Sequence, residues 1–224
     1  MYSSYQCVFT FFFIIILRRW VDTRGYDGYS DYMARLKFFP LASAAYSSSP
    51  QHCIDNNYGN ASLATYYSGE CDPDRYDSCA GFTAVLHDDE AIVLSFRGTV
   101  RFMQLVEETN WSAFHRKTKW VAGGYVSTYF YNAFMAVWNG GLNESFEALV
   151  ATYPNYNIWV TGHSLGASMA SLAASYVIAR KSISGGNVKL ITYGQPRTGD
   201  AAFAASHNRL VCQNNSQAFI PETH

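Results

Sequence analysis

A serine between two glycines, in Gly162-His163-Ser164-Leu165-Gly166, is the part of the sequence with the clearest capacity for chemistry. β-Branched and aromatic residues precede this pentapeptide, and a run rich in small residues follows it. Gly-x-Ser-x-Gly between a strand and a helix is typical of a nucleophile elbow, where a tight turn exposes the serine hydroxyl. We expect the two glycines to be needed because a Cβ would clash with nearby backbone. The pattern predicts that Ser164 attacks a carbonyl carbon.

Alternating strands and helices are predicted around this motif. Apolar or alternating runs indicate strands, and apolar residues at helical spacing indicate helices. Because strands that alternate with helices form largely parallel sheets covered on both faces, we expect an α/β fold of three layers with a mainly parallel sheet. The expected strands are 82–87, 91–96, 157–161 and 188–193, and the expected helices are 32–39 (ended by Pro40), 100–109, 125–138, 142–153 and 165–180.

The 224 residues divide into four predicted parts. Residues 1–19 contain an apolar run, Val8 to Leu17, which is too short to cross a bilayer and suits a signal peptide or an anchor. Residues 20–81 are rich in Ser, Asn, Gly and Cys, so we expect an N-terminal helix followed by cysteine-containing loops. Residues 82–205 form the predicted α/β core, and 206–224 a divergent, disordered tail.

Cysteine usage and the N-terminal apolar run favour secretion. Cys71 and Cys79 flank an Asp/Pro/Asp turn segment and are natural disulfide partners. Removal of a signal peptide would leave four of the five cysteines, which allow three pairings. Asn-x-Ser tripeptides support the same location weakly, because they are common by chance. We predict an extracellular protein, with membrane anchoring by residues 8–17 as the alternative.

Charge and residue spacing exclude several classes of function. The net charge of −1 gives no reason to expect binding to nucleic acid or to an anionic membrane surface. The sequence contains no Cys-x-x-Cys pair and no two histidines at the i, i+4 spacing of a helix, so these patterns indicate no metal site. No glycine-rich phosphate-binding loop is present. We therefore expect neither a cofactor nor a metal.

Four sequence blocks together resemble one enzyme family. They occur in the family's order and cover about residues 80–205. On these blocks the chain is similar to the class 3 lipases, the α/β-hydrolase family of the filamentous-fungal triacylglycerol lipases, and especially to its nematode-type secreted members. The blocks are Val93-Leu94-Ser95-Phe96-Arg97-Gly98-Thr99, Gly123-Gly124-Tyr125, Gly162-His163-Ser164-Leu165-Gly166 and Tyr193-Gly194-Gln195-Pro196-Arg197-Thr198-Gly199-Asp200.

The resemblance implies a role for each matching residue. Ser164 would be the nucleophile, and the backbone N–H groups of Leu165 and Thr99 would form the oxyanion hole. The amphipathic segment 100–109 stands where the family carries its lid, whose apolar face opens at a lipid surface. Packing in the core is the alternative for that segment. Arg97 would hydrogen-bond loop carbonyls.

The sequence departs from the family pattern after Phe203. The family continues with a strand, the catalytic Asp and a long stretch that carries the catalytic His, and none of these is identifiable here. Asp200 matches a family position that is not the triad acid, and His207 is expected to be a solvated loop residue. We predict a C-terminally truncated chain that lacks one or more strands. Its triad acid and base stay unassigned, with His224 as a candidate base.

The function expected from these observations is hydrolysis of carboxylic esters of lipids, such as triacylglycerol, through an acyl intermediate on Ser164. The expected partner is a lipid ester, met at a lipid–water interface. Two alternatives stay open. One is a catalytically inactive lipid-binding remnant or truncated gene product, and the other is a small-ester or feruloyl-type esterase. The apolar residues of 102–106 favour a lipid substrate over a small ester.

Overall fold

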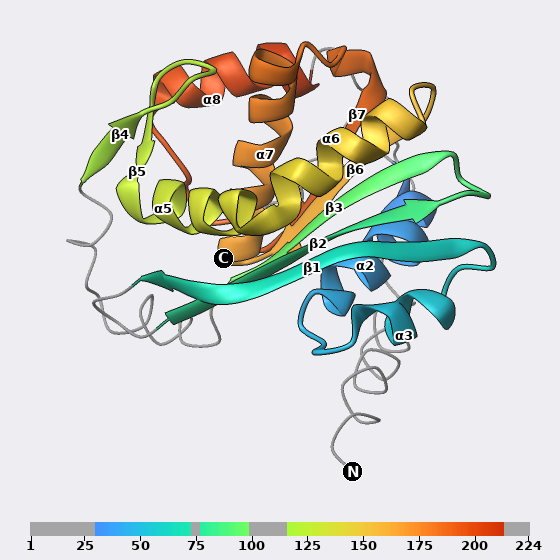
Figure 1. Cartoon of the computed structure of the whole chain (residues 1–224). Coiled ribbons are helices and arrows are strands. Elements are labelled where there is room, and N and C mark those ends of the chain that lie inside the picture. Colours follow the sequence, from blue (N-terminus) through green and yellow to red (C-terminus); the bar gives the residue numbers. More distant parts are fainter. Residues whose placement is uncertain (1–29, 73–76, 99–115, 213–224) are drawn as a thin grey trace.

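The computed structural model describes residues 30–72, 77–98 and 116–212, and a five-stranded sheet lies at its centre (Figure 1). The strands lie in the order β1-β2-β3-β6-β7. A separate two-stranded sheet pairs β4 with β5. The bounds are β1 Ala61–Asp72, β2 Asp77–Leu86, β3 Ala91–Arg97, β4 Lys117–Lys119, β5 Tyr125–Ser127, β6 Asn157–His163 and β7 Val188–Tyr193.

The central sheet is mixed, with a parallel half and an antiparallel half. Strands β3, β6 and β7 are parallel to one another, whereas β1 and β2 pair antiparallel next to β3. Parallel strands need helical crossovers, and these cover the sheet on both faces. Six successive residues of β3 are accordingly buried. The expected three-layer α/β-hydrolase fold is confirmed, with a mixed sheet where a mainly parallel one was expected. The parallel strand β6 leads directly to Ser164.

Strand β1 corrects the prediction of loops over residues 41–81. It pairs with β2 from Ala61↔Leu86 to Asp72↔Asp77, so 61–72 and 77–81 are strand. From 61 to 70 the residues of β1 are partly buried or exposed, and many are Ser, Thr, Gly or Tyr. Such a strand forms because its neighbour offers a backbone ladder, and its local composition carries little signal. The prediction failed because it considered composition alone.

The helices form a layer on each face of the sheet (Figure 1). Alternate side chains of β3 point to opposite faces, so Ile92 and Leu94 pack with one layer and Val93 packs with the other. The first layer holds α5 Thr128–Val137, η4 Trp138–Leu142, α6 Asn143–Thr152 and α7 Leu165–Lys181. The second layer, called the N-terminal layer below, holds η2 Met33–Phe38, α2 Phe39–Ala44 and α3 Pro50–Asp55.

The N-terminal layer continues through the proline that was expected to end its helix. Pro40 lies in the first turn of α2, directly after η2. A proline is tolerated there because the N–H groups of a first helical turn have no partner within the helix. Phe38 of η2 and Leu41 of α2 are fully buried and pack against the sheet. The predicted helix 32–39 is thus one part of a longer helical segment.

The remaining helices follow the predicted pattern closely. The Asn-Gly-Gly stretch breaks the aromatic-rich helix at Gly141, which has φ of 131°, and α6 continues beyond it. Helix α7 ends at Lys181, one residue beyond the predicted end, with Ser182 in the left-handed region. Short helices connect the last elements: η5 Gly185–Asn187, α8 Ala201–His207 and η6 Asn208–Cys212.

Cys71 and Cys79 form a disulfide across the β1–β2 hairpin, as predicted. Several other predictions concern segments outside the described residues: the signal peptide or anchor at 1–19, the lid segment 100–109 and the tail from 213 to 224. The start of that tail, 206–212, is helical. Across residues 30–72, 77–98 and 116–212, no helix combines the length and hydropathy of a membrane span.

Candidate active site

Ser164 joins β6 to α7 in a backbone conformation that non-glycine residues rarely adopt. Its φ is 58° and its ψ is −125°. Within the described ranges only Glu90 and Ser182 are further non-glycine residues with positive φ. A residue held in such a sparsely populated region costs about 1–3 kcal/mol, so the surrounding structure must impose it. This geometry is that of the strained strand-to-helix turn that the Gly-x-Ser-x-Gly motif predicted.

Three glycines let the backbone close tightly around Ser164. A Cβ on Gly162 would overlap the carbonyl of Gly166, and a Cβ on Gly166 would overlap the carbonyl of Phe96 in β3. A Cβ on Gly98, just after β3, would overlap the side chain of Leu165. The end of β3 and the start of α7 therefore pack without intervening side chains. These contacts agree with the prediction that a Cβ at Gly162 or Gly166 would clash with nearby backbone.

Hydrogen bonds hold the Ser164 backbone from both sides. Its N–H donates to the carbonyl of Tyr193, at the end of β7, over 2.9 Å. Its own carbonyl accepts from Ala167 N over 2.9 Å and from Ser168 N over 3.3 Å. The side chain makes no capping hydrogen bond to the helix that it precedes. The hydroxyl oxygen is thus not used to satisfy α7, although the residue as a whole is 7 % exposed.

The first turn of α7 offers hydrogen-bond donors next to Ser164. The N–H groups of a first helical turn have no acceptor within the helix, and the helix dipole adds partial positive charge there. Leu165 is the first residue of α7, so its N–H belongs to this set. Such a site suits a developing oxyanion. The second predicted donor, Thr99, lies outside the described residues; Gly98, which precedes it, contacts Leu165.

His163 contacts Tyr46, a residue that the sequence reasoning did not consider. The hydroxyl of Tyr46 lies 2.9 Å from His163 Nδ1, and the two rings are 5.9 Å apart between centroids. Burial raises the pKa of Tyr46 to about 12, and the nearby charge of Arg97 opposes this rise. His163 is an exposed residue, and Tyr46 is one of its hydrogen-bond partners. No local signal at Tyr46 indicated the contact, because Tyr46 comes from the N-terminal layer.

Asp200 and His207, two titratable residues near the end of the described chain, are both held by contacts within the fold. Asp200 caps α8: its Oδ1 accepts from Phe203 N over 2.8 Å and from Tyr125 N over 3.1 Å. These hydrogen bonds, that of Phe203 foremost, lower the pKa of Asp200. His207 was predicted to be a solvated loop residue, and this is wrong: it lies in α8, is 8 % exposed and packs edge-on against Phe203. Burial lowers the pKa of His207 to about 4.

His207 also lines a cavity of about 580 Å³ that does not include Ser164. The cavity lies between α7, β7, the loop after β7 and the α8–η6 segment, and Leu190 and Val211 are among its apolar lining residues. His224 and Glu222 lie outside the described residues. In the part of the chain that the structure describes, no group of three or more His, Cys, Asp or Glu side chains could hold a metal ion.

Arg97 is held at the edge of the site by β2. Its Nη2 donates to the carbonyl and to the hydroxyl of Ser78, each over 3.2 Å. Arg97 was expected to bond loop carbonyls, and the carbonyl that it reaches belongs instead to Ser78 in strand β2. Its charge lies near enough to Tyr46 to lower the pKa of that phenol slightly against the effect of burial.

Curated proteins with similar sequences are lipases. A lipase of Caenorhabditis elegans is 30 % identical over 186 residues, which are 82 % of this chain and 51 % of the relative. Secreted mono- and diacylglycerol lipase A of Penicillium cyclopium is 35 % identical over 140 residues, which are 62 % of this chain and 43 % of the relative. The chain thus spans about half the length of the curated relatives that it matches.

Solved structures of fungal lipases share the fold. The lipase of Rhizopus microsporus var. chinensis superposes with a TM-score of 0.66 at 23 % identity, covering 82 % of this chain and 64 % of that one. Lipase II of Rhizopus niveus gives a TM-score of 0.67 at 22 % identity, covering 77 % and 65 %. The family model for lipase (class 3) matches residues 93–222, so the match begins within the 80–205 expected from the blocks and ends beyond it, in the tail. The chain therefore belongs to the class 3 lipase family.

Proposed function

We propose that this chain is a serine hydrolase that cleaves carboxylic esters of lipids through an acyl intermediate on Ser164. The single observation that carries the proposal is the strained backbone of Ser164 at the N-terminus of α7. Membership of the class 3 lipase family supports ester hydrolysis as the reaction class. The chain spans about half of its curated relatives, so the activity is assigned here as a proposal.

The proposed reaction follows from the geometry around Ser164. Its Oγ attacks the ester carbonyl carbon, and the carbonyl oxygen gains negative charge in the tetrahedral intermediate. The N–H of Leu165 then donates to that oxygen, with the N–H of Thr99 as the second donor. Collapse of the intermediate expels the alcohol and leaves an acyl-serine. Water then hydrolyses the acyl-serine and releases the fatty acid.

A general base is needed for the first step, and its identity is part of the proposal. The imidazole of His163 is engaged with Tyr46, and His207 lies in a cavity that excludes Ser164. We assign the base and its carboxylate partner to residues outside the described ranges, where His224 is a candidate. In this fold the acid and the histidine follow the serine along the chain.

Lipid esters are the proposed substrates, and the extracellular space is the proposed location. The printed names of two relatives describe a lipase and a secreted mono- and diacylglycerol lipase. The segment 100–109, predicted as an amphipathic lid, would provide the apolar surface for acyl chains. The Cys71–Cys79 disulfide supports an oxidising compartment.

A second function, non-catalytic binding of lipid esters, is favoured by one observation. His163 is hydrogen-bonded to Tyr46, and His207 lines a cavity whose lining residues do not include Ser164. Loss of the triad histidine alone reduces kcat by about 10⁶-fold in a serine protease, so a chain without a base would bind an ester and barely turn it over. The first experiment must therefore separate binding from turnover.

Labelling with a fluorophosphonate probe tests for an activated serine. Purified full-length chain is treated with the probe, and the modified residue is located by mass spectrometry. We expect covalent labelling of Ser164 in the wild type and none in Ser164→Ala. Ser184→Ala, which removes an exposed serine away from the turn, is the matched control and should label like the wild type.

Turnover and binding are then measured on the same preparations. Release of p-nitrophenol from butyrate and palmitate esters compares short and long acyl chains, and flotation with triolein emulsions measures binding without turnover. Faster hydrolysis of the palmitate ester at an interface supports the lipase proposal. Flotation of a chain that neither labels nor hydrolyses would replace it with the binding function, and preference for feruloyl esters would replace the substrate class.

A further inference from the structure

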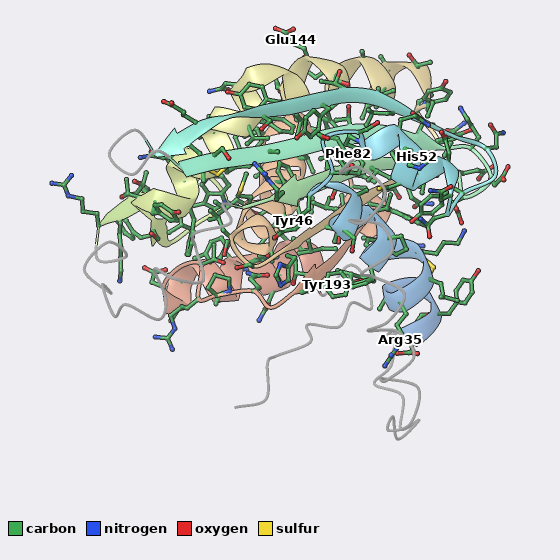
Figure 2. The ribbon with its side chains drawn as sticks, turned by 90° about the horizontal axis from the view of Figure 1, so that it is seen from below. Arg35, Tyr46, His52, Phe82, Glu144 and Tyr193 are labelled. Atoms are coloured by element: carbon green, nitrogen blue, oxygen red, sulfur yellow. A yellow bond between two sulfur atoms is a disulfide. The ribbon has the colours of Figure 1, made fainter. Side chains whose placement is uncertain are left out.

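The N-terminal layer reaches the ends of both strands that flank Ser164. Tyr46 follows α2 and contacts His163, the last residue of β6. Tyr193 is the last residue of β7, and its hydroxyl donates to the carbonyl of Ala34 in η2. Both tyrosines therefore connect the N-terminal layer to the residues next to Ser164. Figure 2 labels the two side chains on the side of the sheet that α2 covers.

The backbone around Tyr46 is fixed by contacts that do not involve His163. Its N–H donates to the carbonyl of Ser43 over 3.0 Å, and the next residue, Ser47, donates to Ala44 over 3.0 Å. Ala44 and Ala45 are fully buried beside it. The turn after α2 is therefore fixed by its own hydrogen bonds and by packing. Its phenol can act as a rigid contact because little further ordering is needed.

The Tyr46 hydroxyl contacts two atoms of His163. It lies 2.9 Å from Nδ1 and donates to the His163 carbonyl over 3.5 Å. That carbonyl belongs to the peptide plane whose nitrogen is the Ser164 N–H. The orientation of this plane and the positive φ of Ser164 are coupled, because both are set by rotation about adjacent backbone bonds.

Tyr193 holds the other side of the same peptide plane. Its carbonyl accepts the Ser164 N–H over 2.9 Å. Its ring packs edge-on against Phe39 at 5.4 Å between centroids, and its hydroxyl bonds to η2. The N–H end of the plane is thus held by β7, and the carbonyl end by Tyr46. Both contacts lead back to one helical layer.

We propose that Tyr46 is a positioning residue that acts through His163, together with Tyr193, to hold Ser164 in its strained conformation. The device rests on the proposed function, since a strained serine is useful only if its hydroxyl attacks an ester. A residue in a sparsely populated region relaxes unless its surroundings over-determine it. The two tyrosines supply that constraint from outside the Gly-x-Ser-x-Gly motif.

The test compares Tyr46→Phe with Tyr58→Phe. Tyr58 also belongs to the N-terminal layer, and its hydroxyl donates to the carbonyl of Lys37, away from Ser164. Each variant loses one hydroxyl and keeps its ring. We expect Tyr46→Phe to slow fluorophosphonate labelling of Ser164 and kcat for the butyrate ester by about three- to ten-fold, the worth of one hydrogen bond, with KM unchanged. Tyr58→Phe should label at the wild-type rate.

A double-mutant cycle separates positioning from general loosening. In a His163→Ala background the imidazole contact of Tyr46 is lost, while the backbone carbonyl that accepts from Tyr46 remains. Tyr46→Phe should therefore slow labelling less in this background than in the wild type. Tyr193→Phe, which releases the other end, should slow labelling in both backgrounds. Equal slowing in the Tyr46 and Tyr58 variants would overturn the positioning role, and full additivity of Tyr46→Phe with His163→Ala would overturn its action through the imidazole.

Hydrogen exchange gives a readout that does not depend on catalysis. Peptides that span 158–168 report protection of the Ser164 amide, whose acceptor is the Tyr193 carbonyl. We expect faster exchange there in Tyr46→Phe and no change in Tyr58→Phe. If the wild type does not label, the proposed function fails while this measurement still decides the positioning role. Unchanged exchange in Tyr46→Phe would overturn it.

Discussion

Two turns in this molecule connect a parallel strand to a helix, and they treat the helix N-terminus in opposite ways. After β7, Asp200 adopts an extended conformation with φ of −82°, and its carboxylate caps α8. After β6, Ser164 adopts φ of 58°, and its hydroxyl leaves α7 uncapped. The helix N-terminus is thus capped by a side chain at Asp200 and left without a side-chain cap at Ser164.

The difference shows how a structural turn is told from a candidate catalytic one. The Asp200 carboxylate accepts the N–H of Phe203 in the first turn of α8, and such a cap stabilises its helix. At Ser164 the side chain gives no acceptor to the first N–H groups of α7, those of Leu165 and Gly166, and the backbone is strained. Both features cost stability. A protein retains such a costly turn when the open donors are needed for a transition state.

The largest expected effect comes from replacing Ser164 by glycine. Glycine adopts positive φ without strain, so Ser164→Gly should abolish labelling while making the fold more stable than Ser164→Ala by about 1 kcal/mol. Urea unfolding of both variants, with labelling measured in parallel, checks this. An alanine variant as stable as the glycine variant would show that the turn holds no strain and that the contrast with Asp200 is wrong.

The second effect concerns pH and the segment after β7. The pKa of His207 is lowered from 6.5 to about 4 by burial. Between these values the unfolded chain binds a proton that the folded chain does not, so stability is complete above pH 6.5 and falls as pH drops toward 4. The loss over this window is about 3 kcal/mol.

His207→Leu provides the matched comparison for that pH dependence. Leucine suits the apolar cavity and carries no titrating group. Unfolding free energies at pH 7 and pH 4.5 should differ less for the variant than for the wild type, since all other groups titrate in both. Equal differences in the two chains would mean that His207 is accessible to water in the folded state. The α8 region would then be open to solvent, contrary to the closed turn described for Asp200.

The sequence predicted the turn at Ser164 well because its signals are local. Gly162 and Gly166 are fixed by backbone contacts within the motif itself and with β3, and such contacts tolerate no other residue. β1 was missed because its ladder partner β2, not its own composition, makes it a strand. Tyr46 was missed for a similar reason: it reaches His163 across 117 positions, and no pattern around residue 46 records that contact.

The smallest expected effect is on Asp200, where the two turns are compared most directly. Backbone N–H groups of Phe203 and Tyr125 hold the pKa of Asp200 below its ordinary value of 3.8. Its charged form therefore stabilises the fold above that pH, and the contribution is lost as pH falls through the lowered pKa. Asp200→Ala should lower Tm by a few degrees at pH 7, and Asp200→Asn, which keeps an acceptor oxygen, by less.

Labelling of Ser164 should keep its rate in both variants, because the cap of α8 supports a neighbouring helix and not the serine turn. A labelling rate that falls in step with Tm would mean that the two turns are mechanically coupled through β5, whose Tyr125 N–H shares the Asp200 carboxylate.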